Sequence, residues 1–527
     1  MGIARVTGAP GQGDGTQGGL HDVEQAMSLS GRMSLSRRRD SFVPKVGTAL
    51  AALGVLVVLF PLALTSQGAG AASATSPEVS FQTAATLSGP VTVGHVVEPL
   101  TAHSPDLAAN GYVEQEYFAS GTAMAFKADS MPSDGKWTIT PTTTAAYKTR
   151  ILVRRPSNPA HFNGTVIVEW MNVSAGESAP DWDDLNPMLM RDGYAYVGVS
   201  AQALGVNGGT AILGSATGGP QGLVNQEPAR YSTLHHPGDQ YALDIYAQIG
   251  QALRAPHDAA LGGLKPTHVL AVGESQSAFY LTTFADAIQP HTNMYDGIFI
   301  HSRGGSGASL AGTSIKSSSG PDNLRIRTDL KVPVFMAETQ TDLILLGYAP
   351  AQQPNTDKIR TWEIAGTAHA DAYTVGAAAG ILGCTTPVNS GPQHNVVEAA
   401  FTAFDKWVDN GTPPPSPPPF KLSSTHPAAL ALNAQGNVIG GVRTPAVDVP
   451  VSTLSGAPPA GANALCSLFG STVAFTPAQL ASLYGTKSNY IAQYTKSLDK
   501  AIAGGYLLSA DKASLLAQAE QVAFPAS

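Results

Sequence analysis

The chain has 527 residues, of which 43% are hydrophobic and 13% are charged, and its formal net charge at pH 7 is -8. This length and hydrophobic content allow at least one large buried core, and length alone would allow about three domains. The acidic balance gives no basic surface for nucleic acid, so the composition argues against nucleic-acid binding.

The N-terminal part of the chain differs from the rest. Residues 1–45 lack an apolar period and end near a run of arginines, which predicts a disordered arm. Residues 46–64 are long enough and apolar enough to cross a bilayer, and small residues at 69–74 offer cleavage sites. We interpret residues 46–76 as a signal sequence or a membrane anchor. Whether the segment is cleaved, and whether export follows the general or the twin-arginine route, stays open at this point.

The basic residues ahead of the apolar segment predict the side of the membrane on which the protein lies. Positive charge keeps the N-terminus in the cytoplasm, so the bulk of the chain is expected outside it. The protein would then be secreted or tethered to the outer face of the cytoplasmic membrane. An uncleaved segment would contact the membrane through residues 46–66 only.

Predicted strands and helices alternate from about residue 91 to residue 420. Short apolar runs predict strands at 148–154, 165–170, 195–199, 267–272, 297–300, 332–337 and 360–364. Helical periodicity predicts helices at 182–191, 239–254, 276–287 and 393–410. This alternation is typical of an α/β fold with a mainly parallel central sheet flanked by helices, so we predict one α/β domain over residues 91–420.

The C-terminal part begins after a proline-rich run at residues 413–419, which predicts a stiff linker or a surface crossing. Helical patterns follow at 477–484, 488–503 and 509–521. We predict a C-terminal helical extension over residues 421–527 that packs on the α/β domain; a separate helical module is the alternative.

Two stretches of the α/β domain, residues 202–226 and 304–323, are too long for simple connections and are candidate borders of an active site.

The chain has two cysteines, Cys384 and Cys466, and both follow the apolar segment. In an oxidising compartment one disulfide between them is the simplest state, and two buried thiols are the alternative. No Cys or His cluster has the spacing of a zinc site, so we expect no metal.

The sequence Gly273-Glu274-Ser275-Gln276-Ser277 joins a predicted strand to a predicted helix. A sharp strand-to-helix turn is where a hydrolase keeps its nucleophile, usually in a GxSxG pattern that leaves room on both sides. Here a serine takes the second small position, which departs from that pattern. Ser275 is the candidate nucleophile, and the alternative is that it merely caps the helix.

An acid and a histidine follow this motif in the order that such hydrolases use. Asp342 lies clear of the end of the strand predicted at 332–337, so we choose it as the acid, with Glu338 as the fallback. His369 follows the last predicted strand, where a general base is expected. A loop histidine is more often only solvated, but three residue types in the required order at strand ends favour a catalytic triad.

The oxyanion hole of such an enzyme uses main-chain amides. The amide of Gln276 is placed by the turn, and a second donor should come from the loop after an earlier strand. The strand at 165–170 leads into such a loop, so the amide of Asn172 or Val173 is the candidate second donor.

Four segments carry a resemblance to a known bacterial family. They are 168–174 (Val-Glu-Trp-Met-Asn-Val-Ser), 273–278 (Gly-Glu-Ser-Gln-Ser-Ala), 341–342 (Thr-Asp) and 362–371 (Trp-Glu-Ile-Ala-Gly-Thr-Ala-His-Ala-Asp). Together they resemble the alpha/beta hydrolase domain proteins, and the likeness extends from about residue 91 to the C-terminus. The resemblance implies an α/β-hydrolase fold with Ser275, Asp342 and His369 as the triad. It implies little about the substrate, because a fold does not determine a function.

The expected function is an exported serine hydrolase without a cofactor, acting on a small-molecule or lipid-like ester. An amidase or acyltransferase would use the same residues. A non-catalytic surface binding protein and a membrane-tethered structural protein are the other classes. Substrate identity and oligomeric state stay open.

Overall fold

The computed structural model describes residues 81–524, apart from 82, 215–217, 256–258, 314–319, 377 and 379–381. These residues belong to one compact unit, Val79–Ser527. The arm predicted at 1–45 and the segment predicted at 46–76 lie outside the described residues. Within the described part of the chain, no helix is both long and apolar enough to span a membrane.

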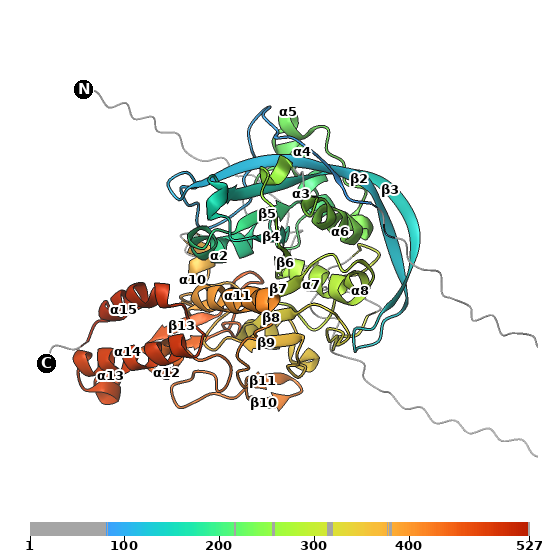
Figure 1. Cartoon of the computed structure of the whole chain (residues 1–527). Coiled ribbons are helices and arrows are strands. Elements are labelled where there is room, and N and C mark those ends of the chain that lie inside the picture. Colours follow the sequence, from blue (N-terminus) through green and yellow to red (C-terminus); the bar gives the residue numbers. More distant parts are fainter. Residues whose placement is uncertain are drawn as a thin grey trace, which may run out of the picture. The chain divides into compact units, whose positions relative to one another are not determined.

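A mixed sheet forms the centre of the unit (Figure 1). Among the described residues it has nine strands, in the order β1-β2-β3-β5-β4-β6-β7-β8-β9. The bounds are β1 (Thr86–Ser88), β2 (Tyr112–Ser130), β3 (Thr138–Pro156), β4 (Thr165–Trp170), β5 (Ala195–Val199), β6 (His268–Glu274), β7 (Gly297–His301), β8 (Val334–Glu338) and β9 (Ile359–Glu363). Strands β4 to β9 pair in parallel, and β1 to β3 are antiparallel to their neighbours. The predicted mainly parallel α/β sheet is confirmed.

Alternate residues of the parallel strands pack into two hydrophobic cores. On β6, Val269 and Ala271 join the core that contains helices α6 (Ala242–Leu253) and α7 (Gln276–Thr283). Leu270 and Val272 join the opposite core, which contains α2 (Pro180–Arg191) and α11 (Gln393–Asn410). This alternation is the two-residue period of a strand. Because helices cover both faces, these strands are continuous apolar runs in the sequence.

Shorter helices connect the main elements. They are α3 (Ala203–Asn207), α4 (Leu223–Gln226), α5 (Pro228–Tyr231), α8 (Gln289–Thr292), α9 (Gln340–Ile344) and α10 (Ala372–Val375). The helix predicted at 276–287 continues past α7 as a π-helical turn, Phe284–Ile288. The helix predicted at 239–254 begins as a 3-10 turn, Asp239–Tyr241, before α6.

Strands β2 and β3 are 19 residues long each, and only part of β3 was predicted. They pair antiparallel along most of their length and curve past α6 (Figure 1). The outer half of β3 carries three consecutive exposed threonines, Thr142, Thr143 and Thr144. A half-exposed antiparallel strand has no continuous apolar run, so the pattern that predicts the buried strands does not detect it.

The chain after Phe420 contains strands as well as the predicted helices. The strands form two small hairpins, β10 (Leu422–Thr425) with β11 (Ala428–Leu430) and β12 (Ser452–Ser455) with β13 (Ser471–Ala474). The helices are α12 (Pro445–Asp448), α13 (Pro477–Tyr484), α14 (Lys487–Ala503) and α15 (Lys512–Glu520). Leu498 and Leu515 share a core with Phe401 and Phe404 of α11. The extension therefore packs against the helical layer of the sheet.

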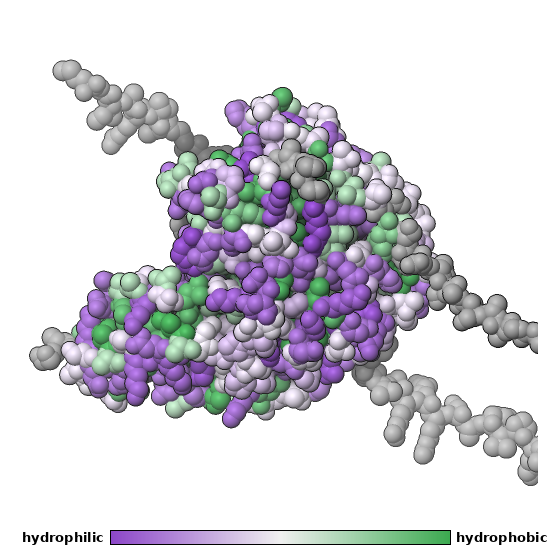
Figure 2. Space-filling view, viewed as in Figure 1, coloured by the Kyte–Doolittle hydropathy of each residue, from purple (hydrophilic) through white to green (hydrophobic). Residues whose placement is uncertain are grey.

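The surface of the extension is partly apolar. Figure 2 shows a largely hydrophilic face with hydrophobic residues grouped where α14 and α15 lie in Figure 1. These helices carry the incompletely buried side chains of Ile491, Tyr494 and Leu516. The extension thus leaves some of its apolar side chains in contact with solvent.

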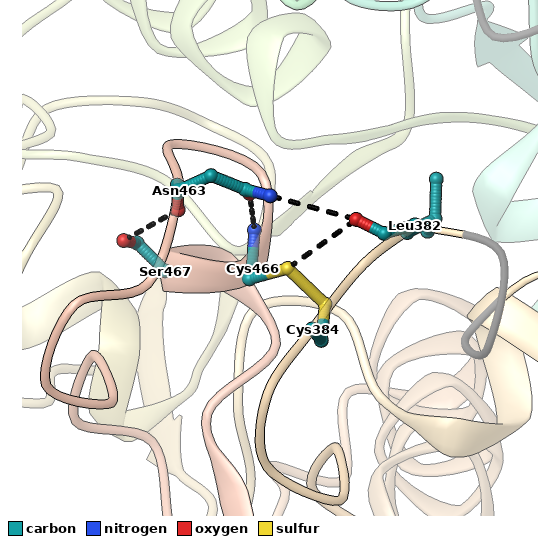
Figure 3. The surroundings of a disulfide bond; sticks show 5 residues. All are labelled: Leu382, Cys384, Asn463, Cys466 and Ser467. Carbon is teal, nitrogen blue, oxygen red and sulfur yellow. Dashed lines mark hydrogen bonds between the residues drawn. A yellow bond between two sulfur atoms is a disulfide. The ribbon is translucent and has the colours of Figure 1, made fainter.

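A disulfide between Cys384 and Cys466 ties the extension to the segment after α10 (Figure 3). The two Cα atoms are 5.5 Å apart, and the cysteines are separated by 82 residues in the sequence. The Asn463 side-chain oxygen accepts the amide of Cys466 at 2.8 Å and so orients the short 3-10 turn that carries it. The bond closes a long loop, which removes conformations from the unfolded chain.

The carboxyl group of Glu398 on α11 predicts a pH-dependent stability. Glu398 is 2% exposed, and its Oε1 accepts the amide of Met188 at 3.2 Å. Burial, and then the nearby Asp511, raises the pKa of Glu398 from 4.5 to about 8. Between these two pKa values the folded state binds a proton that the unfolded state releases. Folding stability therefore falls as the pH rises from about 4.5 to about 8.

We expect Glu398→Gln to gain stability relative to the wild type by roughly 1.4 kcal/mol for each pH unit in that window. Glutamine keeps an oxygen for Met188 but does not titrate. Denaturant unfolding between pH 5 and pH 8 measures the difference, with the exposed Glu520→Gln as the control. A difference that does not change with pH would contradict the prediction.

Candidate active site

Ser275 lies in the turn between β6 and α7. Its backbone has φ 59° and ψ -119°, a region that side-chain-bearing residues rarely occupy. Its amide donates to the main-chain oxygen of His301 at 3.0 Å, at the end of the neighbouring strand β7. The Ser275 side chain makes no capping bond to α7. The hydroxyl is therefore presented by a strained turn and is not used to cap the helix.

The same geometry explains why a serine fits in the second small position. A Cβ atom on Gly273 would lie 3.0 Å from the Cβ of Ser277 and 3.0 Å from Leu281, too close for ordinary contact. Glycine is needed at one side of the turn, and its missing side chain leaves the room that Ser277 occupies. Ser277 is fully buried, and its hydroxyl has no hydrogen-bond partner among the residues that the structure describes.

His369 brings the three candidate triad residues together. Its Nε2 atom lies 2.7 Å from the Ser275 Oγ, and its Nδ1 atom lies 2.7 Å from the Asp342 Oδ1. When Nδ1 carries the proton and donates it to the carboxylate, Nε2 is free to accept a proton from the serine. Ser275 is half-buried and His369 is buried. The arrangement can deprotonate a serine hydroxyl that solvent still reaches.

Asp342 is held by the first turn of α9 and not by a free loop. Its Oδ2 accepts the Thr339 amide at 2.6 Å and the Thr339 hydroxyl at 2.7 Å, in a capping box. The other oxygen, Oδ1, is left for His369. Glu338, the alternative acid, lies at the end of β8, where burial and the Asp342 charge raise its pKa although the Arg303 guanidinium opposes this. Of these two candidates, Asp342 is the acid whose carboxyl group contacts the Nδ1 atom of the histidine.

A second carboxyl group, Glu274, lies beside the histidine and was not singled out in the sequence. Its Oε1 is 3.5 Å from the His369 Nε2. Burial raises the pKa of Glu274 well above its ordinary value, and Asp181, Asp342 and Asp184 raise it further. The imidazole is thus flanked by two carboxyl groups, Asp342 at Nδ1 and Glu274 at Nε2, and the position of Glu274 inside the motif was the only signal for it.

The loop after β4 supplies one of the two predicted amides. The Asn172 amide donates to the Ser178 oxygen at 3.0 Å, so it is already bonded within the loop. The Val173 amide is directed to the nucleophile turn instead, where it donates to the Gln276 Oε1 at 3.0 Å. Of the two candidates, Val173 is the one whose amide faces the site.

Buried charges hold the same loop in place. Glu177 pairs with Arg150, a fully buried residue of β3 that also contacts Glu116. A main-chain bond adds to this, because the Leu100 amide donates to the main-chain oxygen of Glu177 at 2.9 Å. Removing one member of a buried ion pair leaves an uncompensated charge, so these contacts strongly oppose movement of the loop.

The C-terminal extension contacts both helix α9, which carries the acid, and the loop that carries the base. The Thr341 hydroxyl donates to the Gly456 oxygen at 2.7 Å and accepts the His369 amide at 3.2 Å. The Ala370 amide donates to the Leu468 oxygen at 3.3 Å. Residues of the extension therefore help to position the acid and the histidine.

The two long stretches expected to border the site lie in different places. In the first, the Leu213 amide donates to the Ser174 oxygen at 2.8 Å, which brings it against the loop after β4. In the second, the Ala308 amide donates to the Phe279 oxygen at 3.0 Å, which brings it against α7. Among the described residues, no group of three or more His, Cys, Asp or Glu side chains is arranged to hold a metal ion.

A family model described as "Alpha/beta hydrolase domain" matches residues 87–517. The match covers most of the chain, including most of the C-terminal extension, and the predicted fold class is confirmed by it together with the sheet topology. No curated protein matches the chain.

Part of the chain is similar to several solved structures. A suspected dienelactone hydrolase from Klebsiella pneumoniae is 14% identical, with a TM-score of 0.26, and the match covers 46% of this chain and 85% of that one. A glucuronoyl esterase from Solibacter usitatus is 11% identical, with a TM-score of 0.28, and the match covers 55% of this chain and 82% of that one.

Proposed function

Because the chain belongs to the alpha/beta hydrolase domain family, we propose that it is an exported serine hydrolase that cleaves carboxylic esters through an acyl-enzyme intermediate. One observation carries the proposal. The Ser275 Oγ lies 2.7 Å from an imidazole nitrogen, and the opposite nitrogen of that ring lies 2.7 Å from the Asp342 carboxylate. Nucleophile, base and orienting acid are thus within hydrogen-bond reach of one another.

In the first half of the reaction, the Ser275 oxygen attacks the ester carbonyl while the His369 Nε2 takes the hydroxyl proton. The imidazolium that forms is stabilised by Asp342 through Nδ1. His369 then donates the proton to the departing alkoxide, which leaves as an alcohol, and the acyl group stays on Ser275. In the second half, His369 deprotonates a water that attacks the acyl carbon, and the acid is released.

The charge that develops on the carbonyl oxygen needs donors. The Gln276 amide at the N-terminus of α7 and the Val173 amide in the loop after β4 are the proposed donors. The N-terminus of a helix also favours negative charge. This chemistry uses side chains and main-chain amides alone.

A panel of p-nitrophenyl esters of increasing acyl length, with p-nitroanilides of the same acyl groups, tests the proposed reaction. We expect the esters to be hydrolysed and each to turn over faster than its anilide, because an alkoxide or phenoxide leaves more readily than an amide nitrogen. The profile against acyl length identifies the substrate class. Equal or faster anilide hydrolysis would make the protein an amidase, and acyl transfer to an added alcohol in preference to water would make it an acyltransferase.

The export part of the proposal rests on the apolar segment within residues 46–76. Fractionation of cells that express the full chain tests it. Recovery of the protein outside the cytoplasm or in the membrane fraction is expected, and a wholly cytoplasmic protein would contradict it.

A further inference from the structure

The side chain of Gln276 contacts one of the two proposed oxyanion donors. Gln276 is 5% exposed and follows the nucleophile directly. Its Oε1 accepts the Val173 amide at 3.0 Å. The same residue therefore offers its main-chain amide to the site and covers the second amide with its own side-chain oxygen.

An oxyanion hole works by donating to the oxygen that becomes negative during attack. A main-chain amide has one proton, and a well-aligned hydrogen bond uses it for one acceptor. The carbonyl oxygen of a substrate and the Gln276 Oε1 must therefore compete for the Val173 amide. While the Gln276 bond is present, the hole has one donor in place of two.

The loop that carries Val173 does not depend on Gln276 for its shape. Asn172 and Ser178 exchange two main-chain bonds, at 3.0 Å and 2.8 Å. The Asn172 side chain donates to the main-chain oxygen of Glu274 at 3.2 Å and accepts a hydrogen bond from the Ser174 amide at 2.7 Å. These bonds would keep the Val173 amide directed to the site if the Gln276 side chain were shortened or turned away.

We propose that the Gln276 side chain is an internal stopper of the oxyanion hole, occupying the Val173 amide in the resting protein until a substrate carbonyl displaces it. The inference rests on the proposed function. Glutamine suits this role because its amide oxygen is a good acceptor, while its rotatable side chain can move aside without any change in the backbone. A compound whose carbonyl oxygen is a weak hydrogen-bond acceptor displaces the stopper poorly and therefore reacts slowly. The Gln276 side chain thus helps to determine which substrates react.

Two variants separate a stopper from a structural support. Gln276→Met keeps the length of the side chain but removes the acceptor, and Gln276→Glu keeps the shape and strengthens the acceptor; both keep the main-chain amide. The measurement is the second-order rate of inactivation by a fluorophosphonate, whose phosphoryl oxygen requires the hole, together with kcat and KM for a p-nitrophenyl ester. We expect Gln276→Met to react about fivefold faster than the wild type, the effect of one typical hydrogen bond, and Gln276→Glu to react slower.

A matched control is Gln340→Met. The Gln340 Oε1 also accepts a main-chain amide, that of Gly456 at 2.9 Å, but on the acid side of the site. The Gln340→Met variant is therefore not expected to accelerate inactivation by the fluorophosphonate. Slower inactivation of Gln276→Met than of the wild type would overturn the inference and make Gln276 a support of the loop. A wild-type protein that does not react at all would overturn the proposed function and this inference with it, so the two failures are distinguishable.

Discussion

Replacing Ser275 by alanine is expected to lower ester turnover by roughly a millionfold. The hydroxyl supplies the atom that bonds to the acyl group, so its removal prevents the acyl-enzyme intermediate from forming. The imidazole 2.7 Å away would remain, but it would have no proton to accept from a nucleophile. Initial rates with a p-nitrophenyl ester, and labelling by a fluorophosphonate, measure the loss.

Ser277→Ala is the matched control for this substitution. It removes a hydroxyl two residues along the chain, and that hydroxyl is buried without a hydrogen-bond partner in the described part of the chain. We expect it to keep most of the activity, because it does not contact His369. Labelling that persists in Ser275→Ala, or an equal loss in both variants, would refute Ser275 as the nucleophile.

Replacing Asp342 by asparagine is expected to lower kcat by about ten-thousandfold. The cause is the tautomer of His369. Thr339 donates to one carboxylate oxygen of Asp342 with both its amide and its hydroxyl, so the asparagine oxygen should take that position. Its NH2 group then faces the imidazole Nδ1, which must become an acceptor. The proton moves to Nε2, and the ring can no longer act as a base toward Ser275.

Glu338→Gln serves as the comparison for the acid. Glu338 is fully buried at the end of β8 and lies next to the same turn, but its carboxyl is influenced by Arg303 and not bonded to the histidine. The Glu338→Gln variant is therefore expected to lose far less activity than Asp342→Asn. The opposite ranking, measured as kcat with the same ester and checked for folding by thermal melting, would reassign the acid to Glu338.

The buried strands were predicted well because they are local patterns. The predicted strands at 165–170 and 195–199 coincide with β4 and β5, and the predicted helix at 393–410 coincides with α11. Burial on both faces makes a parallel strand an uninterrupted apolar run, and partial burial gives a helix a period of 3.6 residues. Strand β2 escaped detection because its pairing with β3 is set by a partner strand and not by its own hydrophobicity.

The candidate site was predicted in part. The order of Ser275, Asp342 and His369, and their places after predicted strands, are visible in the sequence. The capping box that holds Asp342 was not recognised, although Thr339 three residues before it was a local signal for one. The choice of Val173 over Asn172 depended on a bond to Ser178 across a turn of the loop, which no pattern predicts.

The amino-acid order alone therefore specifies the α/β class, the strained turn and a short set of residues with the right chemistry, because each depends on neighbours a few positions apart. The distances that turn this set into a site join residues far apart in the chain: 94 positions separate His369 from Ser275 and 103 separate Gln276 from Val173. Such distances follow from the register of β4, β6, β8 and β9 in one sheet and from the packing of the extension against their ends. They are properties of the assembled core, in which many side chains must fit at once, and no segment carries them separately.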